Sequence, residues 1–572
     1  MKQQRGAALV VVLSMLAMSL MLGLSGMQSS LIDERLAGNY RAASLAQMGA
    51  ERAVAEAWGV GGSLLHKDDF DDALDLSVSE LFEYNWQQFS NLVGVSLDVC
   101  EDEDEDDVNC RFYLLQETNN FYIVGMGAVD DGRAAVSELV FVEVYLGGEA
   151  GPFSDGVVGC EGVELRGSGR VDSYSSYPDF PDGIADGPQA YDPNNHNSNA
   201  SVRTLDGGDV KLQGHSPIFG NVSSDRDVIA VGSAPIEGDI RANRDVRLDG
   251  NNTFDGNAQA VGDVIVNSGK ITGDAFANAN ITFNNWGGEI QGNAQYGGDI
   301  FFTSRGEDHV GGQHANEDPQ IQEQPQEPCD PLGIRDLVDG FSLVNNGPLD
   351  VGANQNPVLS EAGFVGNGGG EQGGNDDSLE IGSVDFLEGR PGQTAMRFSK
   401  LDIGSNGSLT IGEPDHPQHI VMVVDGDVNV SGGGDGLVIA EGSTLTLVVG
   451  GSVHLQGGVD IRGAGVVTPW TDSNGEQQLV PSLGIYSTAD QNDLGNQAGV
   501  RLRGNTDMYA TVYAPFADVS VGGSGNLFGS VRGRTAEFFG SGGMHYDEAL
   551  GRVASDSGGE TGDGQFRVLS WR

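Results

Sequence analysis

A repeat of about 18 residues constrains the fold more than any other feature of the sequence. Glycine followed by Asn or Asp recurs at Gly220, Gly238, Gly256, Gly273 and Gly292, at spacings of 18, 18, 17 and 19 residues. Three apolar columns keep the same period: Val228, Val246, Val264, Ile281 and Ile300; Ala230, Leu248, Val266, Phe283 and Phe302; and Ile236, Phe254, Ile271 and Ile290. This period fits three short strands per coil of a β-solenoid, in which residues two apart face the interior together. The sequence predicts such a solenoid over residues 148–335, with a Gly-rich sandwich as the alternative.

The β signal resumes after two polar segments, residues 306–331 and 363–377, which we expect to be loops. Runs rich in β-branched residues follow, among them Ile420–Val424 and Leu445–Val449, but their spacing is less regular. We interpret residues 336–572 as a second β region, either an irregular solenoid or a capping sandwich. The sequence does not decide whether the two β regions form one continuous solenoid.

The N-terminal part has a different character. Residues 7–32 contain no charged side chain, and Lys2 and Arg5 precede them. A helix of this length spans the ~30 Å hydrocarbon core, and the basic residues orient the rest of the chain outward. Good helix formers continue to Trp58, so we predict one helix over residues 7–58, with Leu45, Met48 and Val54 at helical spacing.

Three strand-like runs follow the helix at Arg111–Gln116, Phe121–Met126 and Val136–Leu146. Short polar turns separate them, which is typical of an antiparallel sheet. Residues 59–147 are therefore predicted to form a small sheet that makes an α+β unit with the helix. The whole chain is predicted to be mainly β.

Composition limits the partners. The formal net charge is −53 among 572 residues, which disfavours nucleic acid because binding it needs basic patches. The four cysteines lie on the outward side, where an even number indicates disulfides. Cys100 and Cys110 enclose a short acidic loop and are the preferred pair, which leaves Cys160 with Cys329.

The segment RGAALVVVLSMLAMSLMLGLSGMQ (5–28), with DERLAGNY (33–40) after it, resembles the N-terminus of PilX-type minor pilins of type IV pili. The resemblance implies cleavage by prepilin peptidase after Gly6 and a mature, N-methylated N-terminus at Ala7, so residues 1–6 are the leader. The family motif falls on Asp33, Glu34, Arg35, Gly38 and Asn39. The predicted sheet of residues 59–147 fits a pilin-like domain.

The implied location is the inner membrane with a large periplasmic domain, and then an extracellular pilus built with other major and minor pilins. One position departs from the family. Most major pilins carry Glu at the fifth mature position, where this chain has Val11, as in the tip pseudopilin of type II secretion. This favours a tip or initiation role over repeated incorporation along the shaft.

The C-terminal part resembles domains attached to PilX-type N-termini in environmental bacteria. The matching segments are GCEGVELRGSGRVDSY (159–174), CDPLG (329–333), YAPFADVSVGGSGNLFGSVRG (513–533) and HYDEAL (545–550). The resemblance implies one large β domain that contains both Cys160 and Cys329. It implies architecture and no activity.

A search of the sequence for chemistry yields no catalytic assignment. Asp376 and Asp377 are adjacent carboxylates without a basic partner, and His545 is interpreted as a structural hydrogen-bonding group. The acidic run Glu101–Asp107 lacks the ligand spacing of an EF-hand, so a solvated loop is favoured over a Ca²⁺ site and no cofactor is predicted.

Our first functional hypothesis is a non-enzymatic minor pilin that displays a β domain for adhesion, with surface glycans among its candidate partners. The alternatives are a membrane-anchored carbohydrate-active enzyme built on a β-helix and a bactofilin-like structural polymer.

Overall fold

The computed structural model describes residue 15 and residues 41–54, 81, 84–92, 96–98, 108–117, 120–130, 135–147, 152–178, 180, 187–303, 306–317, 319–324, 327–365, 371–372, 379–386, 392–413, 416–431, 435–456, 459–461, 465–471, 477–495, 497–553 and 565–571. The chain divides into two compact units. Unit 1 contains Met1–Glu149 and Glu560–Arg572, and unit 2 contains Ala150–Gly559. Unit 2 is therefore an insertion between two segments of unit 1.

Unit 1 contains an antiparallel sheet which, within the described residues, has five strands in the order β1-β2-β3-β4-β47. These are β1 (Ser96–Asp98), β2 (Val108–Glu117), β3 (Asn120–Asp130), β4 (Ala135–Gly147) and β47 (Gln565–Trp571). The three predicted strand runs lie in β2, β3 and β4. Residues 565–571, which the sequence analysis places in the second β region, pair instead with β4. Sequence distance hides this pairing, because unit 2 separates the two strands.

The two faces of this sheet are covered differently. On one face Val124 and Met126 pack with Phe89 of α3 (Trp86–Phe89). On the other face, Gly125 and Gly127 of β3 lie against helix 41–54. The side of this helix that meets the sheet consists of Val54 and of small residues, all of them buried: Ala42, Ala46, Gly49, Ala50 and Ala53.

The predicted helix over residues 7–58 is described only at residue 15 and over residues 41–54, which are helical. The expectation that Leu45, Met48 and Val54 form the buried side of this helix is corrected in part. Met48 is 63% exposed, and the alanines make most of the contact with the sheet. Among the described residues, no helix is both long and apolar enough to cross a membrane. The predicted membrane-spanning segment, apart from Met15, lies outside those residues.

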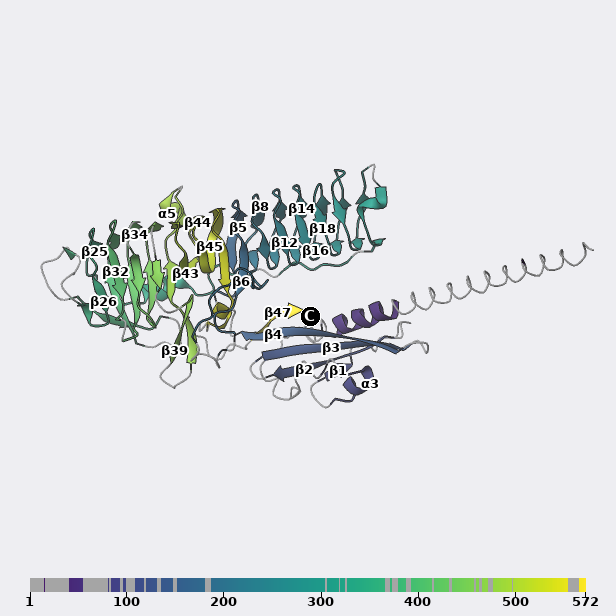
Figure 1. Ribbon diagram of the computed structural model, residues 1–572, viewed down its shortest axis with the longest axis horizontal. Coiled ribbons are helices and arrows are strands. Elements are labelled where there is room, and N and C mark those ends of the chain that lie inside the picture. Colours follow the sequence, from purple (N-terminus) through teal and green to yellow (C-terminus); the bar gives the residue numbers. More distant parts are fainter. Residues whose placement is uncertain are drawn as a thin grey trace, which may run out of the picture. The chain divides into compact units, whose positions relative to one another are not determined.

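Unit 2 is built on a mainly parallel sheet of 35 strands, as counted over the described residues (Figure 1). In its first part nearly every strand pairs in parallel with the strand three further along the chain, one repeat away. The strands form three sets. The first set is β7 (Val202–Thr204), β10 (Val222–Ser224), β13 (Ile240–Ala242), β16 (Ala258–Ala260), β19 (Ala275–Ala277), β22 (Ala294–Tyr296) and β24 (His314–Asn316). The second is β8 (Asp209–Leu212), β11 (Val228–Ala230), β14 (Val246–Leu248), β17 (Val264–Val266), β20 (Ile281–Thr282) and β23 (Ile300–Phe301). The third is β6 (Val171–Tyr174), β9 (Ile218–Phe219), β12 (Pro235–Glu237), β15 (Thr253–Asp255), β18 (Lys270–Ile271) and β21 (Glu289–Ile290).

The predicted columns are confirmed by this register. Val228, Val246, Val264, Ile281 and Ile300 pair in series, and Ile236, Phe254, Ile271 and Ile290 do the same. All of these side chains except the half-buried Ile300 are buried in one hydrophobic core. Burial of such apolar columns is the main stabilising contribution to stacked coils.

The Asn and Asp residues of the repeat have a structural role that their spacing alone did not reveal. The Oδ1 atom of Asp239 accepts a hydrogen bond from the backbone N–H of Asn257 at 2.8 Å, and Asn257 Oδ1 accepts one from Asp274 N at 2.9 Å. A second ladder runs through Asp245 and Asp263 in the same way. These bonds satisfy backbone donors at the corners between strands, where no strand partner is present.

The glycine before each residue of the first ladder, such as Gly238 before Asp239 and Gly256 before Asn257, allows the coils to approach closely. A Cβ atom at Gly238 would lie 2.5 Å from the carbonyl oxygen of Gly220 in the preceding coil, and the φ angle of Gly238 is 150°. Only glycine adopts this conformation without strain. The recurring Gly-Asn and Gly-Asp pairs therefore mark corners of the coil.

The second array is longer per coil and joins the same sheet. Its strands are β25 (Pro348–Val351), β30 (Gln393–Phe398), β31 (Lys400–Ile403), β33 (His419–Val424), β34 (Val428–Ser431), β36 (Thr444–Val449), β37 (Val453–Gln456), β41 (Leu483–Ser487), β42 (Val500–Gly504), β43 (Met508–Ala514), β44 (Val519–Gly523), β45 (Leu527–Gly540) and β46 (Met544–Asp547), with short β28 (Glu371–Gln372) and β29 (Gly382–Val384). A separate sheet holds β26 (Val358–Ser360), β27 (Gly363–Val365), β32 (Ser408–Ile411), β35 (Gly436–Ile439) and β38 (Val459–Ile461), and β39 (Val467–Thr471) and β40 (Gln477–Pro481) form a hairpin. Short helices α4 (Ile334–Asp339) and α5 (Gln491–Leu494) and 3₁₀ turns η4 (Gly306–His309) and η5 (Glu548–Arg552) lie at the margins.

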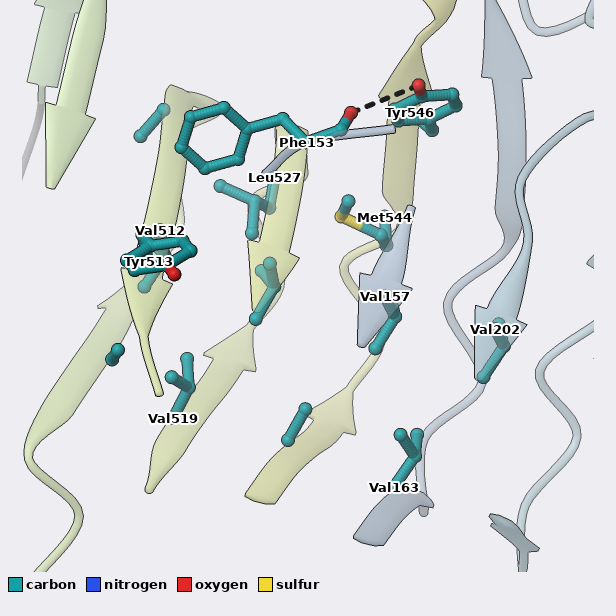
Figure 2. Packing of buried hydrophobic residues seen from close by; sticks show 14 of the residues in the cluster. Phe153, Val157, Val163, Val202, Val512, Tyr513, Val519, Leu527, Met544 and Tyr546 are labelled. Atoms are coloured by element: carbon teal, nitrogen blue, oxygen red, sulfur yellow. Dashed lines mark hydrogen bonds between the residues drawn. The ribbon is translucent and has the colours of Figure 1, made fainter. Parts of the chain in front are cut away.

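The two arrays meet at β5 (Val157–Leu165), in the middle of the stack. β5 pairs with β7 and β8 of the first array and with β45 of the second, all in parallel. Figure 2 shows the core at this junction, where Phe153, Val157, Leu527 and Met544 come from both arrays. Unit 2 thus begins at the middle of the stack. The first array, called the first arm below, extends outward from there. The chain then returns, and the second array, called the second arm, runs from its far end back to the middle.

A return segment, residues 319–324 and 327–347, connects the arms. Asn278 and Asn243 each hold its backbone through two hydrogen bonds, to Ile321 and Gln324 respectively. Further along, Glu327 makes an ion pair with Arg203 at 2.6 Å. The predicted polar loop 306–331 includes the first half of this segment.

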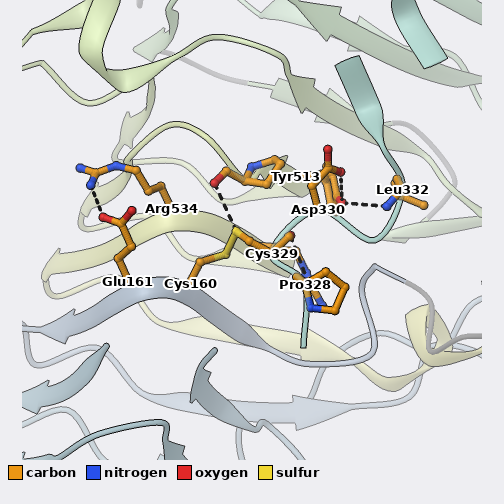
Figure 3. Close-up of a disulfide and its surroundings, with 10 residues drawn as sticks. Cys160, Glu161, Pro328, Cys329, Asp330, Leu332, Tyr513 and Arg534 are labelled. Carbon is orange, nitrogen blue, oxygen red and sulfur yellow. Dashed lines mark hydrogen bonds and ion pairs between the residues drawn. A yellow bond between two sulfur atoms is a disulfide. The ribbon is translucent and has the colours of Figure 1, made fainter. Parts of the chain in front are cut away.

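A disulfide joins the return segment to the central strand. Cys329 is bonded to Cys160 of β5, with a Cα–Cα distance of 5.6 Å (Figure 3). Next to it the Tyr513 hydroxyl donates to Asp330 at 2.6 Å. Arg335 then stacks over the ring of Phe516, 3.7 Å from its centroid. The return segment therefore contacts both arms of the sheet.

Candidate functional site

One column of the sheet near the junction carries rings instead of small polar side chains. Tyr509, Phe528, His545 and Asp172 occupy equivalent positions on four successive coils. Their sequence neighbours Met508, Leu527, Met544 and Val171 are in the core. Because successive side chains of a strand point to opposite faces, the column lies on the outer face of the sheet.

The rings of this column contact one another. Tyr509 and Phe528 are stacked, with centroids 4.7 Å apart and planes 11° apart, and Phe528 and His545 are separated by 4.8 Å. The segment 187–199 crosses the column and adds Tyr191, whose ring centroid lies 4.1 Å from that of His545. Four rings therefore form one continuous aromatic surface.

Asp172 organises the other end of the column. Its carboxylate is fully buried and accepts a hydrogen bond from the Tyr191 hydroxyl at 2.6 Å. The second oxygen lies 2.5 Å from His545 Nδ1, and Arg170 is 3.5 Å away. A buried charge needs such partners. Burial, and then the hydrogen bond to Asp172, raise the pKa of Tyr191 well above its ordinary value, so this hydroxyl stays a donor.

The rings and polar side chains line an open cleft with a volume of about 920 Å³. Arg170, Gln189, Asp507 and Asn526 contribute polar groups to it. Asp507 and Asn526 belong to a ladder like those of the first array. Asn526 N donates to Asp507 Oδ1 at 2.9 Å, and Gly543 N donates to Asn526 Oδ1 at 2.8 Å. The cleft therefore combines an aromatic wall with polar groups held by the backbone, an arrangement suited to binding an amphipathic small molecule.

Sequence reasoning did not bring this cleft together. Segments 159–174, 513–533 and 545–550 had been noted for their resemblance, and they contain Asp172, Phe528 and His545. The interpretation of His545 as a hydrogen-bonding group agrees with its contact to Asp172. Tyr509 and Tyr191 carried no signal, because they meet the column only through the coil register and the crossing segment.

The sites expected from the sequence are only partly described. Gly6, Ala7, Asp33, Glu34, Arg35, Gly38, Asn39, Val11, Cys100, Asp376 and Asp377 lie outside the described residues, as does the acidic run 101–107. Cys110 is disulfide-bonded. In the described part of the chain, no cluster of three His, Cys, Asp or Glu residues is placed to hold a metal ion.

Asp547, two residues beyond His545, makes stability depend on pH. Its carboxylate is fully buried and accepts hydrogen bonds from Ser176 N and Ala549 N at 3.0 and 3.1 Å. Burial raises its pKa from 3.8 to about 6. Between these values the native state holds a proton that the unfolded state has lost, so stability falls as pH rises through this window and then levels off.

The expected loss between pH 4 and 6 is about 3 kcal/mol, and Asp547→Asn should abolish it. The measurement is urea unfolding of the full chain from pH 4 to 7, with the exposed Asp192→Asn as the control. Identical pH slopes in wild type and Asp547→Asn would contradict the assignment.

Comparisons with known proteins match an N-terminal and a C-terminal part of the chain. A family model described as PilX N-terminal matches residues 5–57, and a domain of unknown function (DUF7305) matches residues 399–553, which include most of the cleft column. No curated protein matches the chain. Among solved structures, the competence-associated pilin ComZ from Thermus thermophilus is similar at 11% identity over 93% of this chain and 97% of that one, with a TM-score of 0.17. A score this low does not establish a shared fold. Residues 5–57 therefore match the PilX N-terminal family, which confirms the resemblance seen in the sequence.

Proposed function

We propose that this chain is a minor subunit of a type IV pilus, non-enzymatic, which assembles through its N-terminal helix and displays unit 2 for adhesion. The observation that carries the proposal is the PilX-type segment at residues 5–57. Helix 41–54 lies on an antiparallel sheet in unit 1, as expected where an assembly helix carries a globular domain.

The insertion of unit 2 between β4 and β47 supports a display role. Both of its ends connect to paired strands of one sheet, so two covalent connections hold the inserted unit. The mainly parallel pairing and the large apolar core that runs through both arrays favour a solenoid closed around that core. Stacked coils of this kind offer an extended surface for display.

The proposed pathway follows the PilX-type segment. Prepilin peptidase removes the leader, residues 1–6, and Ala7 becomes the methylated N-terminus. Before assembly the helix lies in the inner membrane. The helix then packs with other major and minor pilins in the extracellular fibre. Val11 in place of the usual Glu, together with the size of unit 2, favours a tip or initiation position.

Replacing Gly6 by valine is expected to block leader removal, because the peptidase must fit the residue before the cut. The variant should keep Met1 and disappear from sheared surface fibres, whereas wild type should begin at methylated Ala7. Mass spectrometry of the N-terminus and immunoblotting of sheared fractions check this. Gln3→Ala, also in the leader, is the control. A mature-sized Gly6→Val product on the surface would refute the prepilin assignment.

A further inference from the structure

The cleft beside the ring column has polar atoms for which the described residues supply no hydrogen-bond partner. Tyr509 ends the column, because β41 on its other side pairs only from Thr511 onward. Within the described residues, Phe528 is the one ring that stacks on Tyr509, and Tyr509 lines the open cleft, so a ligand in the cleft can pack against this tyrosine. We propose that this cleft binds a neutral oligosaccharide, with a pyranose ring on Tyr509; as the adhesive ligand of the displayed unit, it rests on the proposed function.

The aromatic wall suits a sugar. One face of a pyranose ring consists of C–H groups, which pack on an aromatic face, while its hydroxyls point outward from the ring edge. Tyr509 is half-buried and therefore fixed in position, yet it lines the open cleft. A fixed ring loses little side-chain entropy when a ligand packs on it.

The polar groups beside Tyr509 match adjacent hydroxyls. Each ladder bond uses only one side-chain atom, so Asp507 Oδ2 and Asn526 Nδ2 have no hydrogen-bond partner in the described part of the chain. They are an acceptor and a donor on neighbouring coils, ~4.8 Å apart along the stack. A sugar hydroxyl both donates and accepts, so two adjacent hydroxyls can satisfy both groups.

The charges of the cleft favour a neutral sugar over a uronate or a sialylated glycan. Arg170 is engaged by the buried carboxylate of Asp172 and by the carbonyl of Pro193, at 3.5 and 2.8 Å. Asp507 is exposed and negative, and the chain as a whole carries a formal charge of −53. Among the described residues that line the cleft, no free cation offsets this negative potential for an anionic ligand.

The test is binding of the detergent-purified full chain to an array of neutral, N-acetylated, uronate and sialylated oligosaccharides, followed by calorimetry on the best ligand. We expect a neutral or N-acetylated ligand, and at least about tenfold weaker binding in Tyr509→Ala and in Asp507→Asn. Asp507→Asn keeps the ladder acceptor and replaces only the free carboxylate oxygen.

Matched controls separate the site from general effects on the fold. Phe301→Ala removes a ring that is 51% exposed at the far end of the first arm, and Asp239→Asn makes the same change at a ladder position remote in sequence. Both should bind like wild type.

Several outcomes would overturn the inference: no glycan bound, equal binding by Tyr509→Ala and Asp507→Asn, or a preference for anionic glycans. Cleavage of the bound oligosaccharide would do so as well, since it would assign the Asp172–His545 pair to catalysis. The Gly6→Val precursor should bind the same glycans as wild type. Failure of glycan binding with normal cleavage after Gly6 would therefore remove this inference and leave the pilin assignment standing.

Discussion

Replacing Gly127 by valine is expected to separate helix 41–54 from the sheet of unit 1. A Cβ atom at this position would overlap the carbonyl oxygen of Ala46 and would lie 2.6 Å from the backbone nitrogen of Ala50. These are backbone atoms of a regular helix, so no side-chain rotation relieves the overlap. We expect a loss of at least about 3 kcal/mol in the stability of unit 1, which is at the upper end for overpacking.

The contact has this form because glycine and alanine bring two backbones together. At Gly125, the other glycine on this face of β3, a Cβ atom would lie 2.7 Å from Val54 Cγ2. The helix offers Ala46 and Ala50 at the same places, both fully buried. Valine at residue 127 can be accommodated only if the helix moves away, which exposes this alanine face.

Thermal unfolding and hydrogen exchange of peptides from residues 41–54 measure the effect. Ser137→Val on β4 is the control, since it adds the same kind of side chain at a half-buried position of the neighbouring strand. If the amides of residues 41–54 are equally protected from exchange in the Gly127→Val and Ser137→Val variants, the close contact does not stabilise the helix on the sheet. Under the proposed function, the variant should also reduce the amount of protein in surface fibres.

This helix shows how far sequence reasoning reaches. Helical propensity correctly predicted the helical state of residues 41–54, because many good helix formers act additively along a segment. The buried side of the helix was predicted only in part, because Val54 is buried as expected whereas Met48 is exposed and alanines make most of the contact. The signal that decides it is the pair Gly125 and Gly127, about 80 residues away along the sequence, and it has meaning only once β3 lies beneath the helix.

The same distinction holds in unit 2. The repeat columns could be predicted because consecutive coils place equivalent residues at a constant period. The junction could not, because the contact between Asp155 and Ser530 joins residues 375 positions apart, and the period on the two sides differs. The cleft could not be predicted for the same reason. Its column takes Asp172 from the start of unit 2 and Tyr509, Phe528 and His545 from the end.

Removing the disulfide between Cys160 and Cys329 is expected to destabilise the first arm far more than the second. The bond closes a loop with a sequence separation of 169 residues, and this loop contains the whole first array and the start of the return segment. In the loop-entropy description, a loop of this length lowers the free energy of the folded arm by about 5 kcal/mol relative to the unfolded one.

The effect should be local because stacked coils contact only their neighbours. Without the bond, Glu327 and Asp330 still hold the return segment through Arg203 and Tyr513. The arm therefore folds in the Cys160→Ser/Cys329→Ser variant but opens more often. Peptides from residues 202–316 should exchange amide hydrogens up to about 4,000-fold faster, while peptides from residues 419–456 should be unaffected.

Hydrogen exchange with mass spectrometry on the full chain measures both regions in one experiment. Cys100→Ser/Cys110→Ser is the matched control, because it removes two cysteines from unit 1 and leaves the Cys160–Cys329 loop closed. Uniform acceleration across both arms would contradict the locality argued here. It would mean that the whole parallel sheet of unit 2 opens as one cooperative body, with the central strand β5 transmitting the loss from one arm to the other.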